Sequence, residues 1–262
     1  MGRGFGIAAN IDRDVMKQVA KAAEDAGFSS FWVNDTPGND GLDGLAAAAS
    51  VTSQIKLGVG VIPLDRRPAG SIADDVQRLQ LPLDRLWLGI GSPARQGGLD
   101  TVRSGAAELH ERLQCKVIVA ALGPKMSGVA GEVGDGVLFN WLLPAYVAGS
   151  VERVEFSARQ HDRPRPLMMA YIRSAIMPEG EERLNQEAGR YAGIPNYAAH
   201  FERQGVEAAH TAVRGVNSAA LQSRIEPYEG LLDETVVRAI TVDDSAGKIL
   251  ELLAATAPHN AG

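Results

Sequence analysis

Short apolar runs alternate with amphipathic stretches from one end of the chain to the other. Many of the runs are apolar at successive positions, which is typical of strands buried on both faces of a sheet. Alternation of such strands with helices predicts βα units and a parallel sheet. The strands predicted in this way are eight in number: Phe5 to Ala9, Ser30 to Asn34, Lys56 to Val61, Leu86 to Ile90, Lys116 to Ala121, Val137 to Asn140, Leu167 to Ile176 and Thr235 to Thr241.

The stretches between the strands carry helix signals. After the first strand, Asp12 or Asp14 can cap a helix that has Val19 and Ala23 on its apolar stripe, and Gly27 can end it. The same pattern predicts further helices over residues 40–53, 68–81, 124–133 and 245–255, two of them with proline at the first turn.

The longest connection, Pro178 to Asp233, must hold more than one helix. Long connections at the functional end of a sheet often carry function, so Pro178 to Gly230 is predicted to cover the binding site and to contribute groups such as Tyr197.

These units predict a single-domain (β/α)8 barrel over residues 1–262. The length suits this fold, which needs about 250 residues. A doubly wound open sheet is the rival architecture, and it is disfavoured because no GxGxxG motif follows the first strand. In a barrel, the functional groups gather at the carboxyl ends of the strands.

Composition and charge exclude several function classes. The net charge is −6 and the basic residues are scattered, which argues against a nucleic-acid partner. No long apolar run or signal peptide is visible, so we expect no membrane insertion and a cytoplasmic location. The single cysteine, Cys115, is expected to be buried and inert. No HExxH, CxxC or GxSxG motif occurs, so neither a metal site nor a hydrolytic triad is expected.

Glycines and charged residues at strand ends are the candidates for chemistry. Gly58 and Gly60 lie in the third strand, where glycine indicates close approach of a ligand or a bulge. Gly123 and Pro124 can open a helix whose N–H groups face an anion, or can form an ordinary turn. Asp35 at the end of the second strand is a candidate catalytic residue, or it caps the following turn.

The seventh strand alternates two faces. Leu167, Met169, Tyr171 and Arg173 are expected to face the lumen, since Met168, Ala170 and Ile172 are uniformly apolar and suit the helix layer. Arg173 can therefore bind a phosphate or an anionic substrate, with Arg66, Arg67 and Arg238 as alternatives. A structural salt bridge is the competing interpretation for each of them.

Six segments resemble the luciferase-like monooxygenases and F420-dependent oxidoreductases. They read AGFSSFWVND (26–35), IKLGVGVIPLDRRPAG (55–70), DRLWLGIGSP (84–93), VIVAALGPKMSGVAGEVGDGVLFNW (117–141), RYAGIPNYAAHFERQGV (190–206) and LLDETVVRAIT (231–241). The resemblance implies an F420-dependent oxidoreductase that moves a hydride between the deazaflavin and a small organic substrate. FMN is the alternative cofactor, in a luciferase-like monooxygenase, and a non-catalytic homologue is the third alternative.

The resemblance also implies positions for the cofactor. Its ring is expected against Gly60, Val61 and Ile62, and further contacts are expected from Gly91, Ala121, Leu122, Gly123 and Arg173. A cis peptide bond between Gly60 and Val61 is predicted, with a trans bond in a bulge as the alternative. A homodimer is expected on the same ground.

The chain departs from the family at its acid–base residues. Related sugar-phosphate dehydrogenases have a His after the Asp of the second strand and a Glu after the fourth strand. Here these positions read Thr36 and Ala94. The resemblance therefore implies the barrel and the cofactor site, while the substrate and its catalytic groups stay open.

Overall fold

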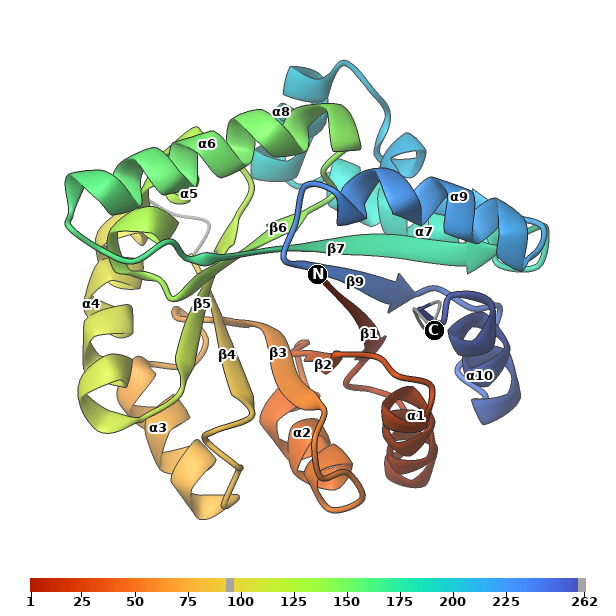
Figure 1. The fold of residues 1–262 in the computed structure, drawn as a ribbon, viewed down its shortest axis with the longest axis horizontal. Helices are drawn as coiled ribbons and strands as arrows, with labels where there is room; N and C mark the ends of the chain where they lie inside the picture. Colours follow the sequence, from red (N-terminus) through yellow and green to blue (C-terminus); the bar gives the residue numbers. More distant parts are fainter. Residues whose placement is uncertain (93–96, 259–262) are drawn as a thin grey trace.

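The structure is a computed structural model that describes residues 1–92 and 97–258. Its strands close into a parallel barrel in the order β1 to β7 followed by β9, which pairs with both β7 and β1 (Figure 1). The pairing of β6 with β7 completes the ring. The predicted (β/α)8 barrel is thus confirmed, including its strand count.

The barrel strands follow the predicted runs closely. Their bounds are β1 (Gly2–Ala8), β2 (Ser30–Asn34), β3 (Lys56–Pro63), β4 (Leu86–Gly91), β5 (Lys116–Ala121), β6 (Gly136–Asn140), β7 (Leu167–Ile176) and β9 (Glu234–Ala239). A three-residue strand, β8 (Val213–Gly215), was not predicted. It pairs with the far end of β7, where Ser174 contacts both Val213 and Ala239.

Helices surround the barrel on its outside (Figure 1). Their bounds are α1 (Arg13–Asp25), α2 (Gly41–Ala49), α3 (Ala69–Arg78), α4 (Gly98–Arg112), α5 (Pro124–Val133), α6 (Pro144–Gln160), α7 (Glu181–Ala192), α8 (Pro195–Gln204), α9 (Ser218–Glu229) and α10 (Ala246–Ala255), with the 3-10 turn η1 (Ala208–Thr211) after α8. None of these helices is long and apolar enough to cross a membrane.

The first helix shows how local signals set these bounds. The Asp12 carboxylate accepts hydrogen bonds from the backbone N–H groups of Asp14 and Val15, so Asp12 is the cap rather than Asp14. Gly27 adopts φ +81°, a conformation that glycine reaches without strain, and the helix ends there.

The core has two apolar layers. Outward side chains such as Phe5, Phe31 and Leu57 pack against the helices in one large cluster. A separate cluster fills the lumen, and it holds Trp32, Ile118, Leu138, Met169, Tyr171 and Val236. Met169 and Tyr171 face the lumen while Met168, Ala170 and Ile172 face the helices, as the alternation predicts.

The connection between β7 and β9 is an insertion followed by an ordinary barrel helix. It carries α7, α8, η1 and β8 before α9, which confirms that it holds more than one helix. Because α9 contacts α10, α6 and β9, it belongs to the outer helix ring. The additional part is therefore the segment 181–215.

Candidate functional site

A cavity of about 730 Å³ opens at the carboxyl ends of β3 to β7. Its walls come from the ends of these strands, the first turns of α4 and α5, and the helix α8. This is the face at which a parallel barrel places its functional groups. Six of the predicted cofactor contacts line it together, namely Gly60, Val61, Gly91, Ala121, Leu122 and Gly123.

The end of β3 forms one side of this cavity. The peptide bond between Gly60 and Val61 is cis, and the strand register shifts between Val59 and Ile62, so the predicted cis bond is confirmed together with an irregularity in the strand. The Gly60 carbonyl accepts a hydrogen bond of 2.8 Å from Asn34 Nδ2. Arg238 Nε in turn donates to Asn34 Oδ1 at 2.7 Å, so the buried Arg238 fixes the orientation of the amide that bonds the Gly60 carbonyl.

Ile62 lies on the other face of the same strand. Its side chain is fully buried in the outer layer, among the helices, and it does not line the cavity. The expectation that Ile62 contacts the cofactor is corrected on this point: the shift of register leaves Gly60, Val61 and Pro63 at the cavity.

Packing inside the barrel explains the glycines of β3, an explanation that the sequence analysis did not include. A β-carbon at residue 58 would overlap the ring of Trp32, and one at residue 60 would overlap the phenol of Tyr171. The space that these glycines leave is therefore filled by two lumen aromatics, whose rings meet edge to face at 5.6 Å. Gly60 still borders the cavity, but Tyr171 alone accounts for the missing side chain.

Two helices begin at the cavity. Gly97 and Gly98 open α4, and Gly123 and Pro124 open α5, with the first residues of both helices in the cavity wall. The free N–H groups of a first helical turn attract anions. The structure therefore offers two such turns to a ligand in one cavity.

Two cations accompany these helix starts. Lys125 lies in the first turn of α5, and Arg203 reaches over from α8 to donate to the Leu122 carbonyl at 3.2 Å. Within residues 1–92 and 97–258, neither side chain has a carboxylate within 4 Å. Arg103 also lines the cavity, but Glu132 and Asp100 engage it, both at 2.8 to 2.9 Å.

The helix α8 closes one side of the cavity. Ile194, Asn196, Tyr197, Ala199 and Arg203 all contribute to the wall. The expectation for Pro178 to Gly230 thus applies to one part of that segment, since α9 packs on the outside of the barrel. Whether this wall contributes to affinity stays a prediction.

Arg173 is not at the cavity wall. Its guanidinium is 1% exposed, donates to Glu187 at 2.9 Å and to Asn140 Oδ1, and lies 3.9 Å from the centre of the Trp141 ring. Burial raises the pKa of Glu187, yet Arg238 and Arg173 beside it bring the net pKa below its usual value. The structure thus corrects the assignment of Arg173 to a cofactor phosphate and supports the alternative of a structural salt bridge.

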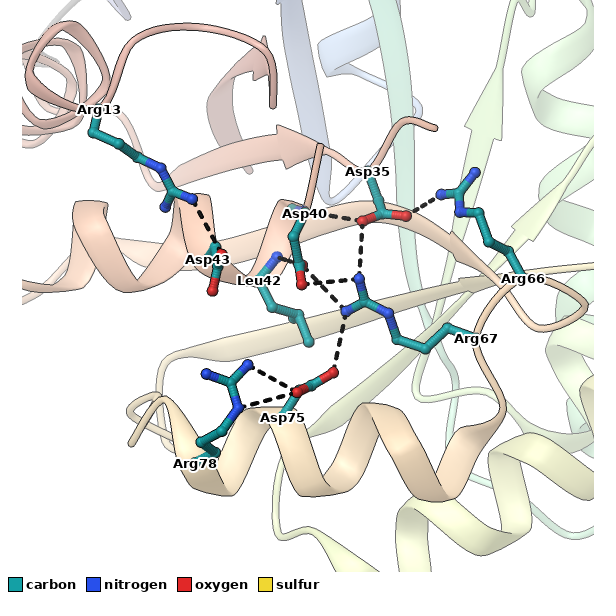
Figure 2. Close-up of polar contacts among 10 residues, drawn as sticks. Arg13, Asp35, Asp40, Leu42, Asp43, Arg66, Arg67, Asp75 and Arg78 are labelled. Atoms are coloured by element: carbon teal, nitrogen blue, oxygen red, sulfur yellow. Dashed lines mark hydrogen bonds and ion pairs between the residues drawn. The ribbon is translucent and has the colours of Figure 1, made fainter. Parts of the chain in front are cut away.

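Asp35 also lies outside the cavity wall. Its carboxylate is 2% exposed, accepts from the Gly41 N–H at 2.9 Å, and contacts the guanidinium groups of Arg66 and Arg67 (Figure 2). Arg67 extends the network to Asp40 and Asp75. The capping interpretation is the one that this geometry supports, and the capped N–H belongs to Gly41, the first residue of α2. The same network accounts for Arg66 and Arg67.

The remaining polar groups at the cavity are neutral. Tyr171 and Tyr197 line it, and burial raises the pKa of both phenols, that of Tyr197 to about 12. Asn140 ends β6 and donates to the Tyr197 hydroxyl at 3.4 Å. Sequence reasoning did not single out Asn140, although its place at the carboxyl end of a strand was a usable signal.

Other sequence expectations can be placed on the structure. Cys115 is half-buried, and burial raises the pKa of its thiol to about 12, which agrees with an inert cysteine. Thr36 lies in a turn with Asn39 and does not line the cavity, whereas Ala94 lies outside the described residues. In the described part of the chain, no three His, Cys, Asp or Glu side chains are grouped as a metal site.

Comparison with known proteins places this barrel in a family. The family model described as luciferase-like monooxygenase matches residues 4–115 and 100–258. A 5,10-methylenetetrahydromethanopterin reductase of Methanolobus tindarius is 26% identical over 95% of this chain and 90% of its own length. The corresponding enzyme of Methanopyrus kandleri is 27% identical over 96% of this chain and 89% of its own length.

Solved structures show the same fold at lower identity. The coenzyme F420-dependent tetrahydromethanopterin reductase from Methanopyrus kandleri superposes with a TM-score of 0.75 at 17% identity, over 98% of this chain and 97% of that chain. The oxygenating constituent of a 3,6-diketocamphane monooxygenase from Pseudomonas putida, in complex with FMN, gives a TM-score of 0.73 at 12% identity, over 98% and 97%. The chain therefore belongs to the luciferase-like monooxygenase family of enzymes.

Proposed function

We propose that this protein is an F420-dependent oxidoreductase, which moves a hydride between the deazaflavin and a small organic substrate in the cavity at the ends of β3 to β7. The observation that carries the proposal is the joint presence, in one cavity, of the Gly60–Val61 strand end and of two helix starts with Lys125 and Arg203. A tricyclic ring with a phosphate-bearing tail needs both a flat apolar wall and an anion site.

The residues present fit such a group. Val61, Ala121 and Leu138 supply apolar wall for a ring. The N–H groups at the start of α5, with Lys125 and Arg203, suit the phosphate. When bound, the cofactor supplies the hydride chemistry, while the chain binds and orients it and limits its contact with water. The curated relatives are reductases, and two of the similar solved structures are of F420-dependent enzymes, which supports the deazaflavin.

FMN is the second candidate, in a luciferase-like monooxygenase. The similar structure in complex with FMN favours it, and FMN also carries a phosphate. Both cofactors would use the same wall and the same anion site. The proposal that F420 is the cofactor therefore requires that the protein binds F420 more tightly than FMN.

Equilibrium binding tests the proposal. The purified protein is titrated with F420, FMN and riboflavin, which lacks the phosphate, and binding is followed by fluorescence. We expect F420 to bind most tightly, and the variants Lys125→Ala and Arg203→Ala each to weaken F420 and FMN roughly tenfold, as loss of a charge-assisted hydrogen bond does. Riboflavin affinity should change little in both variants.

A matched control and a contrary outcome complete this test. Lys17→Ala removes a cation on α1, away from the cavity, and should leave all three affinities unchanged. If FMN binds more tightly than F420, the monooxygenase alternative takes its place. If none of the three compounds binds, the chain is a homologue without this cofactor and the proposal is wrong.

A further inference from the structure

A chain of polar contacts runs from a buried ion pair to the wall of the cavity. Glu187 fixes Arg173 at 2.9 Å, and the Trp141 ring lies 3.9 Å from the guanidinium carbon. Arg173 then contacts the Asn140 amide, and Asn140 contacts Tyr197 at 3.4 Å. Of these five residues, Asn140 and Tyr197 line the cavity.

Arg173 determines which way the Asn140 amide faces. A guanidinium group donates hydrogen bonds and accepts none, so the amide oxygen of Asn140 must be the atom that faces it. The amide nitrogen consequently faces Tyr197 and donates to the phenol oxygen. Because Arg173 is held by Glu187 and by Trp141, this orientation cannot easily reverse.

The orientation of Asn140 leaves the Tyr197 hydrogen free. The phenol oxygen already accepts from Asn140, and no acceptor for the phenol hydrogen lies within hydrogen-bonding distance in residues 1–92 and 97–258. Burial raises the pKa of Tyr197 to about 12, so the hydrogen is present at neutral pH. Tyr197 also lies in the cavity wall on α8, so a compound bound in the cavity can accept this hydrogen.

We propose that the Tyr197 hydroxyl donates a hydrogen bond to a carbonyl oxygen of a compound bound in the cavity, and that Asn140 and Arg173 are positioning residues for this donor. The inference rests on the proposed function and extends it, since it names the ligand group that is recognised, a carbonyl oxygen, and the residue that recognises it, Tyr197. The carbonyl can belong to the cofactor ring or to the substrate, and the two sources are separated by experiment.

Two variants remove the donor in different ways. Tyr197→Phe deletes the hydroxyl alone. Asn140→Asp keeps the size of the side chain and its contact with Arg173, but replaces the amide donor by an acceptor that captures the Tyr197 hydrogen. Tyr191→Phe is the control, because Tyr191 packs against Tyr197 in the same aromatic cluster, at 4.7 Å between ring centres, yet does not line the cavity.

Binding of carbonyl compounds is the readout. Riboflavin presents the carbonyl groups of a ring, and cyclohexanone presents a single substrate-like carbonyl, whose infrared stretch reports its hydrogen bonding. Both donor variants should weaken at least one of the two probes about tenfold and shift its carbonyl stretch to higher frequency. Tyr191→Phe should do neither. A loss confined to riboflavin assigns the ring as the source, and a loss confined to cyclohexanone assigns the substrate.

The outcomes separate this inference from the proposed function. If the wild-type protein binds neither F420 nor any flavin, the proposed function fails, whereas cyclohexanone still tests the donor. The donor role is wrong if both probes bind to Tyr197→Phe as tightly as they bind to the wild type. It is also wrong if neither probe binds to either protein. An effect in Tyr191→Phe equal to that in Tyr197→Phe would mean that the cluster acts by packing, and would also overturn the inference. Urea unfolding of each variant confirms that it is folded.

Discussion

The phenol of Tyr171 occupies the space that a side chain at Gly60 would need. Tyr171 crosses the lumen from β7 to β3, and its hydroxyl has no hydrogen-bond partner within the part of the chain that the structure describes. The glycine and the tyrosine are therefore a matched pair, and a change at either residue tests the packing between them.

Gly60→Ala should destabilise the protein. The added methyl group meets the Tyr171 ring, and overpacking of a dense core typically costs about 1 to 3 kcal/mol. Urea unfolding measures the loss. Gly128→Ala on α5 is the matched control, because a β-carbon there meets no atom within 4 Å and alanine favours the helix, so it should raise stability. Equal stability of Gly60→Ala and the wild type would contradict the packing described here.

Tyr171→Phe should leave the free energy of unfolding unchanged or slightly higher. The change removes a buried hydroxyl that has no partner among the described residues and keeps the ring in place. Removing a buried polar group that has no hydrogen-bond partner also removes the free-energy cost of its desolvation. Urea unfolding is again the measurement. A loss of more than about 1 kcal/mol would show that the hydroxyl is satisfied in solution, for instance by an ordered water.

Arg173→Met should destabilise the protein by about 3 to 5 kcal/mol, because it leaves the buried Glu187 carboxylate without its main partner. The double variant Arg173→Met with Glu187→Leu should recover much of this loss, since it removes both charges. Thermal and urea unfolding of the two variants give the comparison. If the single variant folds as stably as the wild type and loses affinity for phosphate-bearing cofactors, the salt-bridge assignment is wrong.

Asp35→Asn should lower stability by about 1 to 3 kcal/mol without weakening cofactor binding. The amide oxygen can still accept from the Gly41 N–H, but the ion pairs with Arg66 and Arg67 are lost. Urea unfolding and F420 titration together measure both effects. A variant that is fully stable yet binds no cofactor would restore Asp35 as a functional residue.

Glu234 makes stability depend on pH. Burial at the start of β9 raises the pKa of this carboxyl to about 7, against hydrogen bonds from Ser29 and Ser30 that lower it. Between pH 4.5 and 7 the folded chain therefore holds a proton that the unfolded chain has released. The contribution of Glu234 to stability should be greatest below the unfolded pKa, fall as the pH rises to about 7, and then stay constant. The loss from this one group is about 3 kcal/mol, at roughly 1.4 kcal/mol per pKa unit.

The variant Glu234→Gln isolates this effect. An amide at residue 234 can still accept from a serine hydroxyl, and it carries no charge at any pH, so the variant should be more stable than the wild type at pH 8. Glu111→Gln, at an exposed position on α4, is the control and should show no such gain. Urea unfolding at pH 5 and pH 8 measures both. A difference in stability between Glu234→Gln and the wild type that is the same at pH 5 and at pH 8 would contradict the assignment.

Local signals predicted the barrel well because each acts over a few residues. The prediction for α5 coincides with Pro124–Val133, since proline starts the helix and its apolar residues lie on one side. The strand β8 was missed because three residues give no recognisable pattern. The alternation of β7 placed Tyr171 in the lumen, which requires only the period of a strand.

The candidate site was predicted less completely because partners far apart in sequence decide it. The residues that flank Arg173 in sequence do not indicate that Glu187 on α7 will pair with it. Those that flank Asp35 do not indicate that Arg66 and Arg67 will lie beside it in the fold. The glycines of β3 were taken as space for a ligand, whereas Trp32 and Tyr171 fill that space from other strands. The cavity wall at Gly91 and Leu122 was found because the resemblance supplied what local patterns could not.

The direct pairing of β9 with β7 has a consequence for how such barrels diversify. Because barrel closure uses these two strands and not the segment 181–215, the scaffold and the wall over the cavity are separate modules. Chimeras that exchange this segment between related barrels should keep the scaffold intact while changing which compounds are accepted. The exchange must retain Glu187, or replace Arg173 at the same time, since this buried ion pair joins the exchanged segment to β7 of the barrel.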